Sequence, residues 1–247
     1  MTPVLLLVLA SVLAGATLQR VSGIGFAMVV APFTVIALGP AQGVVLVQVC
    51  GVASAALVLS RVVRDTDWAT FARLLPGSAL GVVAGALLAG RVPDGPAQVL
   101  SAVVMLVTLA ASVLVGRLRE LPRSPVVLTA AGGTAGLMTV LAGVGGVALT
   151  ALQQATRWEH RVFLATLQPY LIALSTGTVV ARVVVSPAAW PSLSPAAWAG
   201  VAAALAVGIL AGGRAARWLS GPAAARVTLA LSLAGAVVAL VDGLVGP

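Results

Sequence analysis

The spacing of charged residues along the chain constrains its fold more than any other feature. Charges are separated by long apolar runs, and residues 21–60, for example, contain no charged residue. A charge at the centre of a bilayer costs at least ~2.5 kcal/mol, so uninterrupted apolar runs of this kind predict membrane spans. Only 8% of the residues are charged and 60% are hydrophobic, whereas soluble domains carry roughly 25% charged residues. The composition therefore excludes a water-soluble or disordered chain.

The charges and turn signals divide the chain into apolar segments. Gly39-Pro40 is the natural turn within residues 21–60, and the stretch with Pro187, Pro191 and Trp190 is typical of an interfacial loop. The N-terminal segment lacks the basic residues of a signal peptide, so we take it as a membrane segment. The sequence predicts an all-α polytopic membrane protein with eight hydrophobic segments at residues 4–38, 41–60, 68–90, 96–116, 124–156, 161–182, 197–213 and 223–244.

Two of these segments, 4–38 and 124–156, are too long for one simple crossing, and each contains glycines near its middle. The stretches are Ser22-Gly23-Ile24-Gly25 and Ala142-Gly143-Val144-Gly145-Gly146. Glycine-interrupted segments at matching positions in two halves are a sequence signature of transporter sites. Gly23 also aligns with Gly143, and Gln48 with Gln168, at the same offset. We therefore expect one integral membrane domain of two repeats, residues 1–122 and 123–247, in which segments one and five are glycine-broken or re-entrant.

All 14 basic residues are arginines, and the net charge is +8. Nucleic-acid binding is not expected, because these arginines flank apolar runs instead of clustering on one face. If segments one and five re-enter, only Arg91 and Arg182 lie on one side, and the other side holds the rest apart from Arg20, which we expect to be buried. Short cytoplasmic loops collect arginine, which favours two halves of opposite orientation with both termini outside the cytoplasm. A long tilted or broken helix is the alternative.

The two glycine-interrupted segments also indicate a site that binds an anion. The helix that follows each break presents free N–H groups and a positive dipole end, which together bind anions. Arg20 is a fixed charge beside the first break, and Gln48 and Gln168 offer amides either to a substrate or to an interhelical hydrogen bond. The candidate substrate-binding residues are Arg20, Ser22, Gly23, Gly25, Gln48, Gly143, Gly145, Gly146 and Gln168.

Several classes of function lack the residues that they require. Apart from Asp242 at the C-terminal end, no segment contains an Asp or Glu for a proton or sodium relay. We expect no metal site and no cofactor, because no cluster of Cys, His or carboxylates is present. An intramembrane enzyme would need a nucleophile and a base. The single histidine, His160, lies in a polar connection and not within an apolar segment. A non-transporting membrane subunit is the other alternative.

Four motifs occur in the two halves: residues 22–32, Asp67-Trp68 before residues 75–77, residues 142–146 and residues 161–166. In their order along the chain they resemble the TauE/SafE sulfite-exporter family of bacterial permeases. The second glycine stretch differs from the family pattern, since Val147-Ala148 stands where members often have two prolines. The resemblance implies a transporter of small sulfur-containing anions such as sulfite or organosulfonates. We expect a multi-pass protein of the bacterial inner membrane that exports such an anion by alternating access between the two broken segments. Self-association into a homo-oligomer stays open.

Overall fold

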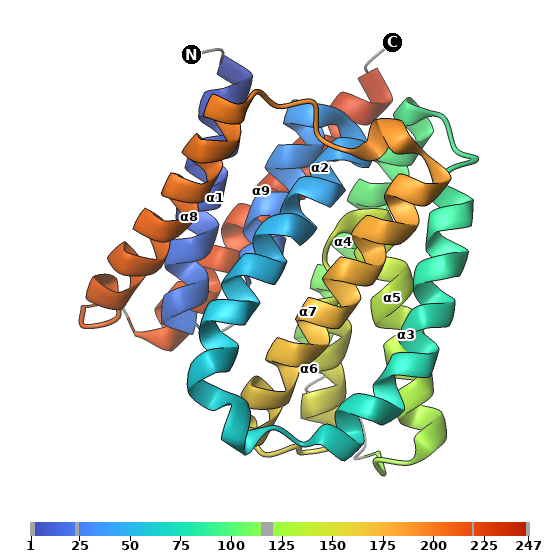
Figure 1. Ribbon diagram of the computed structural model, residues 1–247, viewed down its shortest axis with the longest axis vertical. Coiled ribbons are helices and arrows are strands. Elements are labelled where there is room, and N and C mark those ends of the chain that lie inside the picture. The colour runs from blue at the N-terminus through green and yellow to red at the C-terminus, as the bar shows by residue number, and fades with distance from the viewer. Residues whose placement is uncertain (1–2, 23–24, 115–120, 219, 246–247) are drawn as a thin grey trace.

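The computed structural model describes residues 3–22, 25–114, 121–218 and 220–245, and these residues form a helical bundle (Figure 1). Within this part, eight helical stretches are long and apolar enough to span a membrane. The prediction of an all-α polytopic membrane protein is confirmed. The helices are α1 (Pro3–Ser22), α2 (Phe26–Val62), η1 (Val63–Asp65), α3 (Trp68–Ala89), α4 (Asp94–Leu114), α5 (Pro125–Ala142), α6 (Gly146–Ala155), α7 (His160–Val185), η3 (Pro187–Ala189), α8 (Pro195–Ala215) and α9 (Gly221–Val245).

Helix α2 consists of two arms, residues 26–38 and 40–62, joined at Gly39. Gly39 has φ 78° and ψ 167°, a conformation that only glycine adopts without strain. The first arm returns beside α1, because a Cβ on Gly15 would meet the Phe26 carbonyl oxygen and the Val30 side chain. The chain thus turns back on itself twice between residues 3 and 62.

The two ends of the bundle carry different connections (Figure 1). Both ends of the chain, the Gly39 kink and the α7–α8 connection lie at one end, which we call the terminus end; there, the Gln42 side chain donates to the Ala188 carbonyl oxygen at 3.3 Å. The connections α2–α3 and α6–α7 lie at the opposite end, where Arg161 forms an ion pair with Asp65 at 2.8 Å. We call it the arginine end, because among the described arginines only Arg91 and Arg182 lie at the terminus end.

Side-chain caps fix where several helices begin. Ser124 and Ser194 accept hydrogen bonds from the backbone N–H groups of Val127 and Ala197, and a proline follows each serine at the first helical position. Asp67 caps α3 by accepting from the N–H and hydroxyl of Thr70. Burial by itself would raise the pKa of the Asp67 carboxyl, but the hydrogen bonds from Thr70 outweigh it and lower the pKa below its ordinary value.

Glycines allow helices from the two halves of the sequence to pack backbone against backbone. A Cβ on Gly77 or Gly81 of α3 would overlap the carbonyl oxygens of Thr129 or Gly133 on α5. Helices α1 and α8 approach in the same way, since a Cβ on Gly208 would lie 2.7 Å from the Leu13 carbonyl oxygen. The four-residue spacing of Gly77, Gly81 and Gly85 is therefore a packing device, as is common in membrane helices.

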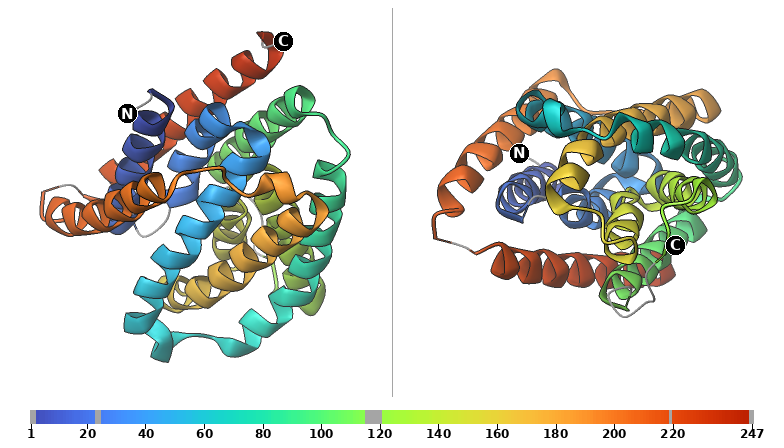
Figure 2. Two further views of the ribbon diagram at one scale, coloured as in Figure 1. Left: turned by 45° about the horizontal axis from the view of Figure 1, so that its top comes forward. Right: turned by 90° about the horizontal axis from the view of Figure 1, so that it is seen from below.

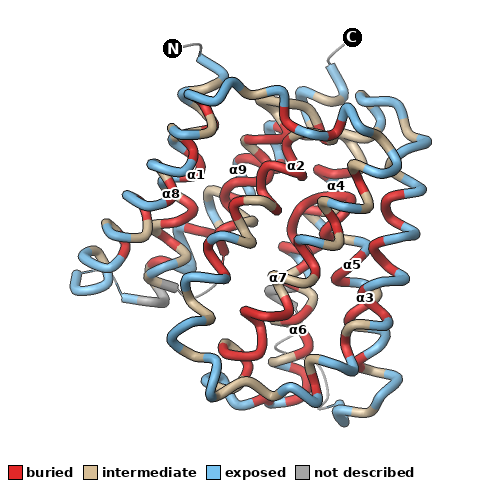
Figure 3. The backbone as a smooth tube through the Cα atoms, in the orientation of Figure 1, coloured by how far each residue is buried: buried red, intermediate tan, exposed pale blue. Residues whose placement is uncertain are grey.

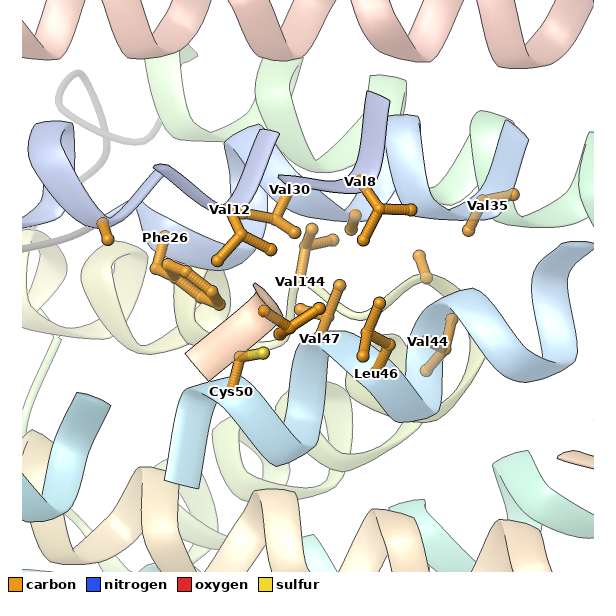
Figure 4. Close-up of a cluster of buried hydrophobic side chains, with 14 of the residues drawn as sticks. Val8, Val12, Phe26, Val30, Val35, Val44, Leu46, Val47, Cys50 and Val144 are labelled. Atoms are coloured by element: carbon orange, nitrogen blue, oxygen red, sulfur yellow. The ribbon is translucent and has the colours of Figure 1, made fainter. Parts of the chain in front are cut away.

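Most of the buried apolar side chains form two clusters, which do not follow the order of the sequence. The first joins α1, both arms of α2 and α8, and Figure 4 shows its side chains converging around Val30 and Val47. The second joins α3, α5, α6 and α7. Figure 2 shows α8 beside α1 on one flank and α3 beside α5 on the opposite flank. Helix α3, from the first half of the sequence, thus packs against α5 of the second half, and α8 of the second half packs against α1 of the first.

Candidate functional site

A cavity of about 70 Å³ lies halfway along the second arm of α2 and along α7. Residues of the turn that ends at Gly25 and of the turn between α5 and α6 line it. Figure 3 shows that buried residues lie mainly on the sides of the helices that face the interior of the bundle. We call it the central cavity. It is lined by Gln19, Gly25, Phe26, Ala27, Met28, Val47, Gln48, Gly51, Thr139, Gly143, Val144, Gly145, Gly146, Val147, Leu167, Leu171, Leu174 and Ser175.

The first turn ends at Gly25, which precedes the first residue of α2. Gly25 has φ 121° and ψ 0°, and no side chain caps the helix that it begins. A Cβ at this position would lie 2.8 Å from Thr228 of α9, so both the backbone conformation and the space require glycine. Gly23 lies outside the described residues, and Ser22 is the last residue of α1. The first turn of α2 therefore presents its backbone N–H groups to the central cavity without a protein acceptor from a capping side chain.

The second turn comprises residues 143–145. Gly143 ends α5 with φ 78°, and a Cβ on Gly145 would overlap both the Thr139 hydroxyl and the Ala135 carbonyl oxygen. Helix α6 begins at Gly146, again without a side-chain cap. Gly145, Gly146 and Val147 line the same cavity as the first residues of α2. The N–H groups of Val147 and Ala148 already donate to the carbonyl oxygens of Val144 and Gly145, so the donors that this end can offer come from Gly145 and Gly146.

Gln48 fixes the position of the second turn. Its amide nitrogen donates to the Gly143 carbonyl oxygen at 3.1 Å, and its amide oxygen accepts from the Ser175 hydroxyl at 2.7 Å. The three groups lie on α2, on the second turn and on α7, and Gln48 is buried. A buried amide with both ends satisfied is rigid, so the glycine turn is held against α7.

The lining is suited to a small anion. Two helix N-termini contribute N–H donors and the positive ends of two helix dipoles. No Asp or Glu lines the central cavity within the described residues, so no negative charge opposes an anion there. Since one water needs about 10–15 Å³ of such volume, the cavity has room for a small oxyanion.

A comparison with known families identifies the family of the chain. A family model described as sulfite exporter TauE/SafE matches residues 7–240. The chain belongs to the TauE/SafE family. Neither a search of curated proteins nor a search of solved structures produced a match. TauE/SafE proteins are membrane transporters, which argues against the intramembrane enzyme considered from the sequence.

The structure places Arg20 and Gln168 of this TauE/SafE protein elsewhere than expected. The expectation that Arg20 is buried is wrong: its side chain is exposed, although its Cβ lies beside Gly212 of α8. Gln168 is buried but does not line the central cavity, and its amide nitrogen donates to the Leu164 carbonyl oxygen at 3.0 Å. Both residues line a second cavity, of about 520 Å³, together with Gln19, Ser54 and Arg61.

This second cavity, the arginine-end cavity, adjoins the central one, because Gln19 lines both. A third cavity of about 580 Å³ lies at the terminus end and is bordered by Pro40, Asp94 and Asp242. We call it the terminus-end cavity. The two wider cavities of this TauE/SafE protein thus differ in charge, with arginines on one side of the bundle and carboxylates on the other.

Several residues that line the central cavity were not predicted from the sequence. Ser175, Thr139 and Gln19 line the central cavity, yet single Ser, Thr and Gln residues in apolar segments give no individual signal. One pattern could have identified Ser175, because it lies seven residues after Gln168 and therefore on the same face of a helix. In this TauE/SafE protein, that helical face passes both the arginine-end cavity and the central cavity.

Proposed function

We propose that this protein exports a small sulfur-containing oxyanion, sulfite or an organosulfonate, across the bacterial inner membrane. The observation that carries the proposal is the meeting of two uncapped helix N-termini, those of α2 and α6, at one central cavity. Membership of the TauE/SafE family supports the choice of substrate class. The N–H donors of the two turns replace the water that the anion loses, as charge-assisted hydrogen bonds.

We assign the candidate substrate-binding residues to two places on the transport route. Gly25, Gly143, Gly145, Gly146 and Gln48 form or fix the central site, and Ser22 and Gly23 stay candidates from the sequence alone. Arg20 and Gln168 act earlier on the route, in the arginine-end cavity, where Arg20 and Arg61 raise the local concentration of anions.

We further propose that the two halves are inverted repeats that alternate access to the central site. The packing supports this proposal, because α1 pairs with α8 as α5 pairs with α3, and α2 and α7 contact each other at the centre. The α1–α2 hairpin also returns to the terminus end, whereas the α5–α6 hairpin returns to the arginine end (Figure 1). The arginine end faces the cytoplasm by the positive-inside rule, which makes the terminus end the exit.

Cysteine labelling tests this topology. In a Cys50→Ala background, Ala41→Cys should react with an impermeant thiol reagent only from the periplasmic side, and Glu159→Cys only from the cytoplasmic side. The reason is that the Gly39 kink and the start of α7 lie at opposite ends of the bundle. Labelling of both positions from one side would contradict the inverted arrangement.

Transport in proteoliposomes tests the site. The wild-type protein should move radiolabelled sulfite down its gradient, and Gly51→Ala should slow organosulfonates about tenfold while slowing sulfite less than threefold, a difference of about 1 kcal/mol. Gly51 lines the central cavity, and a Cβ there makes an ordinary contact of 3.5 Å with the Ser175 hydroxyl oxygen. The added methyl group therefore narrows the cavity without straining the helix.

The matched control is Gly177→Ala on α7, where a Cβ would meet nothing within 4 Å. This variant should transport both substrates at the wild-type rate. Equal slowing of sulfite and organosulfonates by Gly51→Ala would place the size-limiting step outside the central cavity. A wild-type protein that moves no sulfur oxyanion in either direction would overturn the proposed function.

A further inference from the structure

One face of α7 lines two of the three cavities and ends near the third. Leu164 and Gln168 line the arginine-end cavity, and Leu171 and Ser175 line the central cavity. The same face continues through Thr178 to Arg182, because these positions follow one another at intervals of three and four residues. Arg182 in turn contacts Pro40, which borders the terminus-end cavity.

Two buried polar atoms on this face have no hydrogen-bond partner among the described residues. They are the amide oxygen of Gln168 and the hydroxyl of Thr178. The orientation of the Gln168 amide is fixed, because only its nitrogen can donate to the Leu164 carbonyl oxygen. Buried polar groups are nearly always paired, so unpaired ones on a face that links cavities indicate a ligand or its water.

Arg182 is the buried cation of the described part of the chain. Its side chain is only 7% exposed, and it donates to the carbonyl oxygens of Val140 at 2.8 Å and of Pro40 at 3.3 Å. Val140 belongs to the last turn of α5, and Pro40 begins the second arm of α2. These carbonyl groups carry only partial negative charge. An oxyanion is a stronger partner for a guanidinium group than a neutral carbonyl.

We propose that Arg182 is a second anion-binding residue, which takes the transported oxyanion from the central cavity along the Ser175–Thr178 face of α7 and releases it at the terminus end. The proposal rests on the proposed function and adds the second half of the route. When the anion binds, it replaces the Pro40 carbonyl oxygen as the partner of Arg182. The contact between α7 and the Gly39 kink is then released, which opens the terminus-end cavity.

Charge-selective labelling next to Arg182 tests the proposal without a transport measurement. In the Cys50→Ala background, Thr178→Cys is treated with the anionic 2-sulfonatoethyl methanethiosulfonate and with its cationic trimethylammonium analogue. Relative to their rates with a free thiol, the anionic reagent should react about tenfold faster than the cationic one, because a positive charge lies nearby.

The substitution Arg182→Gln should abolish the preference at Thr178→Cys, and Arg91→Gln should leave it unchanged. Arg91 is the matched control, because it is the other described arginine at the terminus end and it is exposed. If Arg182→Gln does not fold, the rate ratio of the two reagents at Thr178→Cys, measured with Arg182 in place, still tests the proposal. A cysteine at 178 that neither reagent reaches, or that both reach at equal relative rates, would overturn the proposal.

Transport separates this inference from the proposed function. Arg182→Gln should raise the KM for sulfite about tenfold, and Arg182→Lys should recover part of that loss, because it retains the charge but not the planar fork of donors. If the wild-type protein transports sulfite and Arg182→Gln has an unchanged KM, the inference fails and the proposed function stands. If the wild-type protein transports no sulfur oxyanion, both fail.

Discussion

Replacing Gln48 with methionine should lower sulfite flux about a hundredfold in proteoliposomes. Methionine has nearly the volume of glutamine but cannot donate to the Gly143 carbonyl oxygen or accept from the Ser175 hydroxyl, both of which Gln48 does. Two buried groups that lose their partners cost about 3 kcal/mol together, which corresponds to roughly a hundredfold in an equilibrium constant. We expect the loss to fall on the conformation that binds the anion, because Gln48 holds the second glycine turn against the central cavity.

Gln42→Met is the matched control for this prediction. It makes the same chemical change on the same helix, but Gln42 lies at the terminus end and bonds to Ala188 and Ser192. Its flux should stay within about twofold of wild type, as is usual for a surface change of at most ~0.5 kcal/mol. Combining Gln48→Met with Ser175→Ala should cost less than the sum of the two single losses, because both remove the same hydrogen bond. Unchanged flux in Gln48→Met would show that the turn does not need this support.

Gly81→Ala should lower the melting temperature of the detergent-solubilised protein by about 3–10 °C, measured by thermal unfolding. The new Cβ would overlap the Gly133 carbonyl oxygen, so α3 and α5 would have to separate. Overpacking of this kind costs about 1–3 kcal/mol, and each kcal/mol shifts the melting temperature of a protein of this size by about 2–4 °C.

Gly133→Ala on the facing helix is the control. Its Cβ would lie 3.5 Å from the Gly77 carbonyl oxygen, an ordinary contact, so the same interface should accept it. Its melting temperature should stay within about 2 °C of wild type, since a tolerated surface change costs at most ~0.5 kcal/mol. Equal losses in the two variants would mean that glycine at Gly81 serves the flexibility of the helix and not the approach of α5.

Much of the fold follows from the sequence because membrane insertion depends on quantities that can be read along the chain. The length of apolar runs, the Gly39-Pro40 turn and the four-residue glycine spacing from Gly77 to Gly85 each act locally. The glycine stretches around Gly25 and Gly145 could be predicted to interrupt helices for the same reason, and both line the central cavity. A Cβ at Gly25 or Gly145 would collide with neighbouring atoms.

The arginines could not be assigned from the sequence, because distance along the chain does not determine which way a side chain faces. Arg20 lies far from any predicted loop, yet its face of α1 is exposed beside α8. Arg182 ends a predicted segment, yet it is buried because the end of α5 and the kink of α2 meet above it. Both outcomes depend on which helices become neighbours. The same holds for the two glutamines. The Gln48 amide bonds to two neighbouring segments, whereas the Gln168 amide donates to a carbonyl oxygen of its own helix.

The packing of α8 against α1 and of α3 against α5 determines which parts of the protein can move together. Any rigid-body motion that preserves the close glycine contacts must carry α8 with α1 and α3 with α5. Residues 63–67 link α3 to α2 and residues 186–194 link α8 to α7, so both connections take part in such a motion. The second connection contains Pro187 and Pro191, whose fixed φ angles make it a stiff strap. A displacement of α7 at the terminus end is thereby transmitted to α8 on the far flank.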